Sequence, residues 1–209
     1  MLDKFDIIDS SHTKEIHNRM LKDLGSLPAG FPMPVLMVGT YGDNDTVNVM
    51  NVAWGGICGM DKIALNLATD RKTLANIQAR KAFTVALADA AHIKEADFFG
   101  IATGNKMPDK FERSGLHAEK SKNVDAPVIQ EFPLTMECRL EEVRECFGEM
   151  RVVGTIVNVL AEESCLDEKG KVDAGKLNAV MFDQFRNGYY AVGEKIAQAW
   201  NAGVEYMKK

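Results

Sequence analysis

The sequence lacks the long apolar runs and the basic excess that mark several classes of protein. Nowhere do about 18 apolar residues follow one another, so no transmembrane helix is predicted. Residues 1–20 mix charges of both signs and contain no apolar signal region, which favours a cytoplasmic protein with no membrane partner. The formal net charge of −5 argues against a nucleic-acid partner, because such a surface needs many basic contacts to phosphates.

Clustered metal ligands and glycine-rich nucleotide motifs are also missing. The four cysteines and four histidines are scattered, with no C-x-x-C and no H-E-x-x-H, so no metal site is predicted and the thiols are expected to be reduced. The glycines form neither a P-loop nor a G-x-G-x-x-G turn between a strand and a helix. Any bound nucleotide must therefore be held by another kind of fold.

What the sequence does contain is 46% hydrophobic residues over 209 positions, enough for one sizeable core. We expect a single domain over 1–209, with an N-terminal helix and lead-in loop at about 1–30 and a C-terminal helix within about 187–209. Alternating apolar residues predict strands at 35–41, 46–57, 62–69, 81–88, 132–146 and 150–164. Helical spacing predicts helices at 13–24, 71–80, 92–100 and 193–200, and 101–111 reads as a loop.

The order of these elements lacks the regular strand–helix alternation of a doubly wound parallel sheet. It favours a mainly β fold of the α+β class, in which a closed antiparallel barrel carries helices on its outside. The last two long strands are expected to pair as a hairpin through the short connection at 147–149.

A change of pattern from strand to helix falls on DRKT (70–73). Asp70 is the natural N-cap, so the first helical turn reads Arg71, Lys72 and Thr73. A helix N-terminus favours acidic residues by about 0.3–1 kcal/mol each, so two cations there call for an explanation. An anion held by free N–H groups, a guanidinium, an ammonium and a hydroxyl is one explanation. Two solvated charges on an ordinary helix start are the other.

Four stretches become informative when they are taken together and in order. They are NVMNVAWGG (48–56), LATDRKTLANIQARKAFTVAL (67–87), DFFGIATGNKMPDKF (97–111) and NGYYAVGEKIAQAW (187–200). In these stretches the sequence resembles the flavin reductase-like family of FMN-binding split barrels, and most closely its flavoredoxin branch. The resemblance covers about 30–200 and implies a six-stranded antiparallel split β-barrel that forms a homodimer and binds FMN near the subunit interface.

The resemblance also implies which residues contact the cofactor. It places one strand along the isoalloxazine ring, with the matching positions Asn48, Asn51, Val52, Ala53 and Trp54. It makes the cationic helix start a phosphate site, with the candidates Arg71, Lys72, Thr73 and Asn76. It adds three positions from the segments GIATG and MPDKF, namely Ile101, Thr103 and Lys110.

For several aromatic and cysteine residues in these stretches, packing in the core is an alternative to contact with the cofactor. Trp54 can fill the core as well as contact a flavin, and Tyr189 and Tyr190 can either pack or cover the flavin or a dimer partner. Cys58 follows the flavin strand, but inert thiols are commoner than reactive ones. No role in binding is therefore assigned to Cys58 or Tyr189 from the sequence.

The resemblance implies an FMN-binding oxidoreductase that passes electrons from NAD(P)H through FMN to free flavin or another acceptor. No catalytic side chain is assigned, because the hydride moves to N5 of the flavin itself. One alternative is a flavoredoxin-type FMN electron carrier that works between partner proteins and has no nicotinamide site. Another is a cofactor-free barrel that serves as a ligand-binding or interaction protein.

Overall fold

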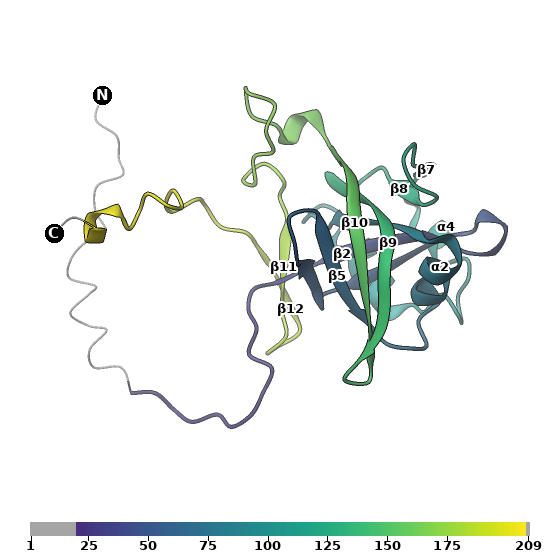
Figure 1. Ribbon diagram of the computed structural model, residues 1–209, viewed down its shortest axis with the longest axis horizontal. Coiled ribbons are helices and arrows are strands. Elements are labelled where there is room, and N and C mark those ends of the chain that lie inside the picture. Colours follow the sequence, from purple (N-terminus) through teal and green to yellow (C-terminus); the bar gives the residue numbers. More distant parts are fainter. Residues whose placement is uncertain (1–19, 208–209) are drawn as a thin grey trace.

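The computed structural model describes residues 20–207, and its centre is a curled antiparallel sheet (Figure 1). Seven strands are hydrogen-bonded in the order β3-β2-β6-β9-β10-β5-β4. Their bounds are β2 (Leu36–Tyr41), β3 (Val47–Val52), β4 (Gly55–Ile57), β5 (Lys62–Leu67), β6 (Ala82–Leu87), β9 (Leu134–Cys146) and β10 (Glu149–Ala161). The fold is mainly β, and the curled sheet is the split barrel that the family resemblance implies.

The chain passes from one edge of this sheet to the other at Ala53 and Trp54. The sequence predicts one long strand over 46–57, whereas the structure has β3 before this point and β4 after it. β3 pairs with β2, and β4 pairs with β5 at the opposite end of the strand order. The interruption therefore brings the two sheet edges together, and it accounts for seven strands where the resemblance implied six.

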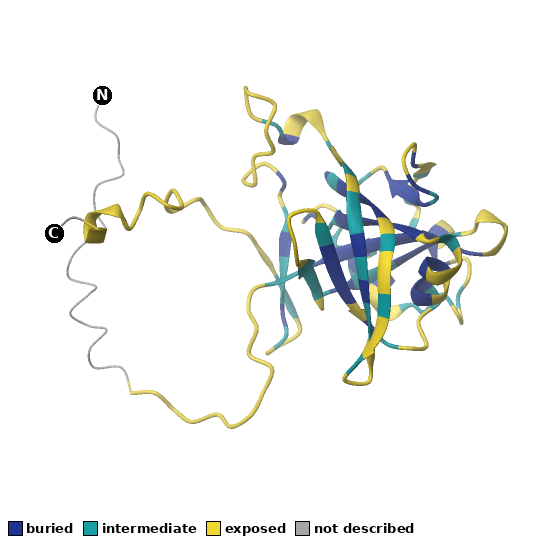
Figure 2. Cartoon of the chain, in the orientation of Figure 1, coloured by how far each residue is buried: buried dark blue, intermediate teal, exposed yellow. Residues whose placement is uncertain are grey.

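The barrel interior is filled by aliphatic and aromatic side chains that alternate along the strands. Phe83, Leu65 and Val152 are fully buried there, and Leu74 and Ile77 of helix α2 (Lys72–Arg80) belong to the same core. Figure 2 shows the buried positions concentrated in the barrel strands and in the inner face of α2. The predicted helix 71–80 thus covers the barrel with its apolar face, as its spacing of Leu74 and Ile77 indicates.

A second apolar cluster lies outside the barrel around helices α3 (Ile93–Ile101) and α4 (Lys110–Ser114). Phe99 and Phe111 stack within it, with ring centroids 6.3 Å apart. The prediction of a helix at 92–100 is confirmed. The predicted loop 101–111 is shorter than expected, because α4 begins at Lys110 once Phe111 has an aromatic partner to pack against.

Two small sheets complete the described chain, and the sequence pattern does not predict them. One joins β1 (Met33–Pro34), β11 (Val180–Asp183) and β12 (Gly188–Ala191), and the other joins β7 (Ala118–Lys120) and β8 (Pro127–Ile129). Their strands are two to four residues long, too short to give a recognisable alternation. Short 3-10 turns lie at Asp43–Asp45, Glu163–Cys165 and Val204–Met207.

The sequence predicts a helix near each end of the chain. The helix expected at 193–200 is wrong, because 192–198 have no regular structure and only Val204–Met207 form a 3-10 turn. Every residue from 191 to 207 is exposed, and a short helix with no packing partner is marginal in water. The helix expected at 13–24 lies mostly outside the described residues, and 20–24 are not helical. Within the described chain, no helix combines the length and apolar character needed to cross a membrane.

Candidate functional site

Two cavities meet beside the start of α2. The larger has a volume of about 510 Å³ and lies along β3, and the smaller, of about 70 Å³, lies at the first turn of α2. They share four lining residues, Met50, Asn51, Arg71 and Gly100. The larger volume falls within the roughly 300–1,000 Å³ typical of small-molecule sites. The pair can therefore hold one ligand that extends from the larger cavity into the smaller one.

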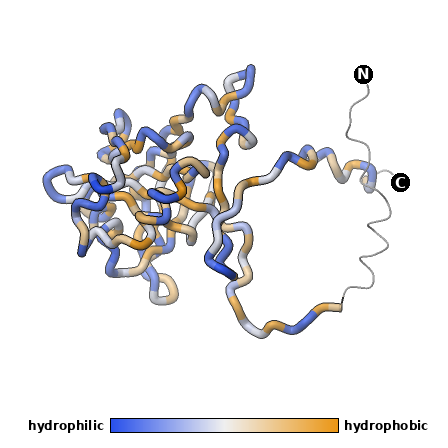
Figure 3. The backbone as a smooth tube through the Cα atoms, turned by 180° about the vertical axis from the view of Figure 1, so that it is seen from behind, coloured by the Kyte–Doolittle hydropathy of each residue, from blue (hydrophilic) through white to orange (hydrophobic). Residues whose placement is uncertain are grey.

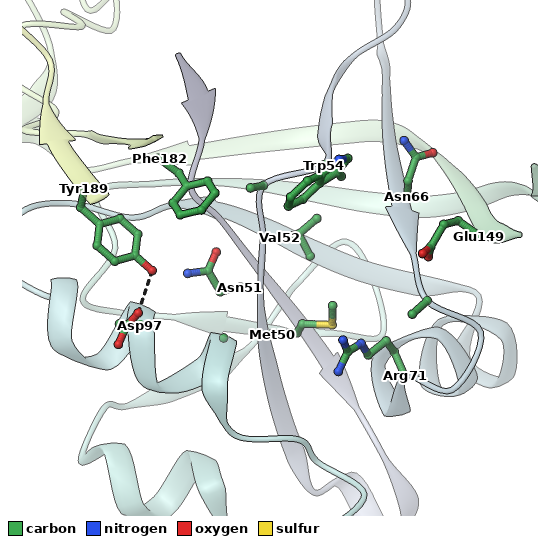
Figure 4. Close-up of a pocket in the computed structure, with 13 residues that line it drawn as sticks. Met50, Asn51, Val52, Trp54, Asn66, Arg71, Asp97, Glu149, Phe182 and Tyr189 are labelled. Atoms are coloured by element: carbon green, nitrogen blue, oxygen red, sulfur yellow. Dashed lines mark hydrogen bonds between the residues drawn. The ribbon is translucent and has the colours of Figure 1, made fainter. Parts of the chain in front are cut away.

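The larger cavity is lined by β3, by the connection to β4 and by the small sheet of β11 and β12 (Figure 4). Asn51, Val52, Ala53 and Trp54 all face it, so four of the five positions on the predicted flavin strand come together here. Trp54 is 52% exposed and lies at the rim rather than in the core. This wall offers both apolar contacts and the amide groups of the strand to a planar ligand.

Tyr189 and Asp97 close one side of this cavity, whereas Arg71 and Glu149 lie at the other (Figure 4). The Tyr189 hydroxyl donates a hydrogen bond to Oδ1 of Asp97 over 2.9 Å. Burial, and then the hydrogen bond from its hydroxyl to Asp97, raise the pKa of Tyr189 to about 12. The bond therefore persists at neutral pH and ties β12 to α3.

The smaller cavity is built at the first turn of α2. Arg71, Lys72 and Thr73, which the resemblance implies as phosphate ligands, all line it. The expected N-cap is wrong by one position, because Arg71 holds the N-cap with extended backbone angles and Asp70 lies before it. Among the described residues, the backbone N–H groups of Lys72 and Thr73 have no backbone acceptor. Free N–H groups at a helix start are suited to bind a phosphate or carboxylate.

Lys110 adds a buried cation to this cavity. Its residue is 2% exposed, and its Nζ donates to the backbone oxygen of Ala102 over 3.0 Å. Burial, and then the nearby charge of Arg71, lower the pKa of Lys110 to about 8. An ammonium in such surroundings favours an anionic neighbour, because an opposite charge offsets the loss of hydration. Thr103, at the start of the turn before α4, lines the same cavity.

Asn48 and Asn76 support the cradle through Thr40. Asn48 Nδ2 donates to Thr73 Oγ1 over 2.9 Å and to Thr40 Oγ1 over 3.2 Å. Asn76 Nδ2 donates to the same Thr40 hydroxyl over 3.0 Å. Asn76 lines a neighbouring polar cavity of about 330 Å³ rather than the cradle itself. Asn76 therefore does not line the cavity of the predicted phosphate ligands, and it is connected to them only through Thr40 and Asn48.

Ile101 is the sequence candidate that the structure does not bring to the site. It is the last residue of α3, it is 76% exposed, and it lines none of the three cavities described here for residues 20–207. Its neighbour Gly100 lines both cavities of the site instead. The structure thus brings the preceding residue of this segment to the site, and the side chain of Ile101 points to solvent.

Several lining residues were missed from the sequence, chiefly Asn66, Asp97, Glu149 and Phe182. They come from β5, α3, β10 and β11, which are far apart along the chain. No spacing rule links them, because only the closure of the barrel brings their segments together. Tyr189, weighed as a packing residue, lines the cavity as well.

The chain belongs to the family described as flavin reductase like domain, whose sequence model matches residues 28–182. Among solved structures, it is similar to flavoredoxin of Desulfovibrio vulgaris (Miyazaki F), with 37% identity and a TM-score of 0.83 over 88% of this chain and 100% of that one.

More distant matches share the fold. A flavoredoxin structure from Methanosarcina acetivorans is 24% identical with a TM-score of 0.80, covering 90% of this chain and 100% of that chain. An FMN-binding protein from Thermus thermophilus is 21% identical with a TM-score of 0.70, covering 86% and 99%. The family and the flavoredoxin at 37% identity support a flavin-associated redox protein.

Proposed function

We propose that this chain binds FMN and works as a flavin-dependent reductase. The observation that carries the proposal is the continuity of the two cavities, because the larger cavity beside β3 runs directly into a cationic cradle at the start of α2. The first cavity offers the apolar and amide contacts that suit an isoalloxazine ring, and the second offers the positive charge that suits the phosphate of the ribityl chain. Arg71, which lines both, would then lie where the ring system and the tail of the cofactor join.

The residues of the cradle have distinct parts in this proposal. Arg71 and Lys72 supply charge, while Thr73 and the backbone N–H groups of α2 supply directed hydrogen bonds to phosphate oxygens. Lys72 is paired with Asp43 over 3.2 Å, but the Asp43 carboxylate is almost fully exposed and competes weakly for the ammonium. One short cradle suits the single phosphate of a mononucleotide.

FMN, when bound, supplies the hydride- and electron-accepting chemistry at its N5. The protein's part is to orient the ring against β3 and to leave one ring face open. Trp54, half exposed at the rim, and the Tyr189–Asp97 pair border that opening. A nicotinamide ring that enters the opening would stack on the flavin, which favours NADH or NADPH as the electron donor.

A second candidate is an FMN electron carrier that takes its electrons from a partner protein. The similarity to a flavoredoxin at 37% identity favours it. The same cavity serves both functions, since a carrier needs an accessible flavin edge and no nicotinamide pocket. The two functions differ in what reduces the bound flavin.

The test is anaerobic stopped-flow spectroscopy of the FMN-loaded protein mixed with NADH and then with NADPH. Rapid loss of the flavin band near neutral pH supports the reductase and identifies the donor. Bound flavin that only dithionite reduces contradicts the reductase and supports the carrier. Protein that takes up no flavin contradicts both. Free FMN mixed with the same nucleotides at the same concentrations is the control.

A further inference from the structure

The polar cavity of about 330 Å³ adjoins the smaller cavity of the site, and we call it the annex. Its walls are the turn between β2 and β3 and the turn at 104–108, and the amides of Asn48 and Asn76 also line it. The annex shares Asn48, Lys72 and Gly104 with the smaller cavity, and among the described residues it shares none with the larger one. The smaller cavity therefore lies between the other two. A phosphate held there has the larger cavity on one side and the annex on the other.

The walls of the annex are held in place by hydrogen bonds within the protein. In the turn between β2 and β3, Arg80 Nη2 donates to the backbone oxygen of Gly42 over 2.7 Å and to Asp45 Oδ1 over 2.8 Å. In the other wall, Asn105 Nδ2 donates over 2.7 Å to the backbone oxygen of Asp70, just before α2. Figure 3 shows the turn between β2 and β3 as a hydrophilic stretch at the edge of the barrel. A polar cavity with fixed walls binds a ligand at a low cost in conformational entropy.

Two side-chain amides in the annex have oxygens to offer to a ligand. Asn48 and Asn76 use their Nδ2 atoms on the hydroxyls of Thr40 and Thr73. Within residues 20–207 no donor reaches the Oδ1 atom of either side chain, and no buried polar side-chain atom is left without a partner. The two Oδ1 atoms are therefore accessible from the cavities that these residues line. They can accept hydrogen bonds from hydroxyl or amino groups, which the sugar and the base of a nucleoside supply.

Lys72 lies at the junction of the cradle and the annex, because it lines both. Its Nζ is 3.2 Å from Oδ2 of Asp43, and Asp43 lines the annex rather than the cradle. The ammonium of Lys72 is thus directed to the annex side of the junction. In the described chain, Arg71 and Lys110 line the cradle without lining the annex. These two cations remain for a phosphate in the cradle, and Lys72 is placed to bind a second phosphate next to it.

We infer that the cradle and the annex together bind a nucleoside diphosphate. One phosphate lies in the cradle, the other lies beside Lys72, and the nucleoside lies among the amides of the annex. The annex volume of about 330 Å³ is within the roughly 300–1,000 Å³ of small-molecule sites. FMN ends at its single phosphate and leaves the annex to solvent, so the proposed function does not use this cavity.

Two ligands present the same nucleoside diphosphate group. FAD carries it as the continuation of the flavin, so that the isoalloxazine ring takes the larger cavity and the adenosine takes the annex. Free ADP carries it without a flavin and competes with FMN for the cradle. The inference rests on the proposed function for FAD, whereas for ADP it does not.

The test measures the affinities of FMN, FAD and ADP for the full chain. FMN and FAD are titrated by flavin fluorescence, and ADP is titrated by isothermal calorimetry into protein freed of flavin. If the group enters as part of the flavin, FAD binds at least as tightly as FMN. If it enters as the free nucleotide, ADP binds the flavin-free protein and displaces FMN competitively.

Gly42→Val fills the annex and leaves the cradle as it is. A Cβ added at Gly42 would meet Asn76 and Lys72 at an ordinary 3.6 Å, and the backbone there is extended, so the barrel should keep its melting temperature. We expect the affinity for FAD or ADP to fall at least tenfold and the affinity for FMN to stay within about threefold of wild type. Gly193→Val is the matched control, because a Cβ there would meet nothing within 4 Å.

Asp43→Asn tests the same site through a gain of affinity, which a folding defect does not produce. The Asp43 carboxylate holds Lys72 and repels a second phosphate, but it is almost fully exposed, so the effect is modest. Affinity for FAD or ADP should rise by up to about fivefold, and the rise should be smaller for FMN. Asp61→Asn, which alters another exposed aspartate paired with a lysine, should change none of the three affinities.

The outcomes separate the inference from the proposed function. FAD that binds more weakly than FMN, together with no binding of ADP at millimolar concentration, overturns the inference and leaves the proposed function standing. Gly42→Val that lowers the affinities for FMN, FAD and ADP equally, or lowers none of them, overturns the inference too. If the wild type binds neither flavin, the proposed function fails, and the ADP titration alone then decides the inference.

Discussion

Asn48 Nδ2 donates a hydrogen bond to Thr73 Oγ1 over 2.9 Å, joining β3 to the first turn of α2. Both residues are buried, and the same Asn48 amide also donates to Thr40. Because Thr73 accepts this bond, its own hydroxyl proton remains available to a ligand in the smaller cavity. The barrel thus holds a directed donor at the place where the cradle needs one.

Replacing Thr73 tests this donor. Thr73→Val keeps the shape but removes the hydroxyl, and one lost hydrogen bond to a charged group is worth about 1.5–3 kcal/mol. FMN affinity should therefore fall at least about tenfold in fluorescence titration, since each 1.4 kcal/mol is a factor of about ten. Thr73→Ser, which retains the hydroxyl, is the matched control and should bind within about threefold of wild type. Equal affinities for the valine and serine variants would contradict the assignment.

Gly104 provides a steric test of the same cradle. A Cβ added there would collide with the Asn48 side-chain oxygen and would approach Lys72 Cβ to 3.3 Å. Gly104→Ala should displace Asn48 and lower FMN affinity by about two- to tenfold, because the loss of the Asn48–Thr73 bond is worth about 0.5–1.5 kcal/mol. Gly30→Ala is the control, because its Cβ would meet a single atom at an ordinary 3.8 Å. Wild-type affinity in Gly104→Ala would show that the cradle does not depend on Asn48.

Lys110 should make FMN binding depend on pH. Its pKa of about 8 in the free protein should rise when a phosphate binds, because the anion stabilises the charged ammonium. Binding then takes up a proton, so affinity is highest below pH 8 and falls as the pH rises through 8. Between pH 7 and pH 9 we expect a fall of up to about tenfold. Isothermal titration in buffers of different ionisation enthalpy measures the proton uptake.

Lys110→Met is the companion variant for that measurement. It keeps the length and the apolar stem of the side chain but cannot titrate. Its affinity for FMN should be lower than that of the wild type at pH 7 and should no longer vary between pH 7 and pH 9. A wild-type affinity that does not change over this range would remove Lys110 from the cradle.

The Tyr189–Asp97 bond should contribute to stability more than to phosphate binding. Tyr189→Phe deletes the hydroxyl and leaves the ring in place, so the free energy of unfolding should fall by about 0.5–1.5 kcal/mol in urea titration. The affinity for inorganic phosphate, a probe of the cradle alone, should be unchanged. An unchanged unfolding free energy would show that water replaces the bond without loss.

The sequence predicted the main strands and helices α2 and α3 because their apolar residues alternate or recur at helical spacing over six or more positions. From Arg71, Lys72 and Thr73 alone it left an anion site and two solvated charges as alternatives, and the family resemblance made them a candidate phosphate site and added the residues of β3. These signals are local, because each one lies within a single strand or helix.

The remaining features depend on contacts that no local pattern encodes. Asp97, Glu149 and Phe182 reach the cavity because the strand order closes the barrel. The N-cap of α2 at Arg71 depends on the path that the chain takes between the end of β5 and the start of α2. The helix predicted at 193–200 does not form even though its apolar residues have helical spacing. All of its residues are exposed, so the described chain packs nothing against its apolar face.

The measurement that tests the central claim most directly is an equilibrium FMN titration of the wild type and of R71A/K72A. Both cations are partly exposed, so solvent screening reduces the value of each contact to about 1 kcal/mol or somewhat more. We predict FMN binding by the wild type, at least about tenfold weaker binding by R71A/K72A, and wild-type affinity in the exposed control Lys122→Ala. Equal FMN affinity in the wild type and R71A/K72A would contradict the phosphate cradle on which the account rests.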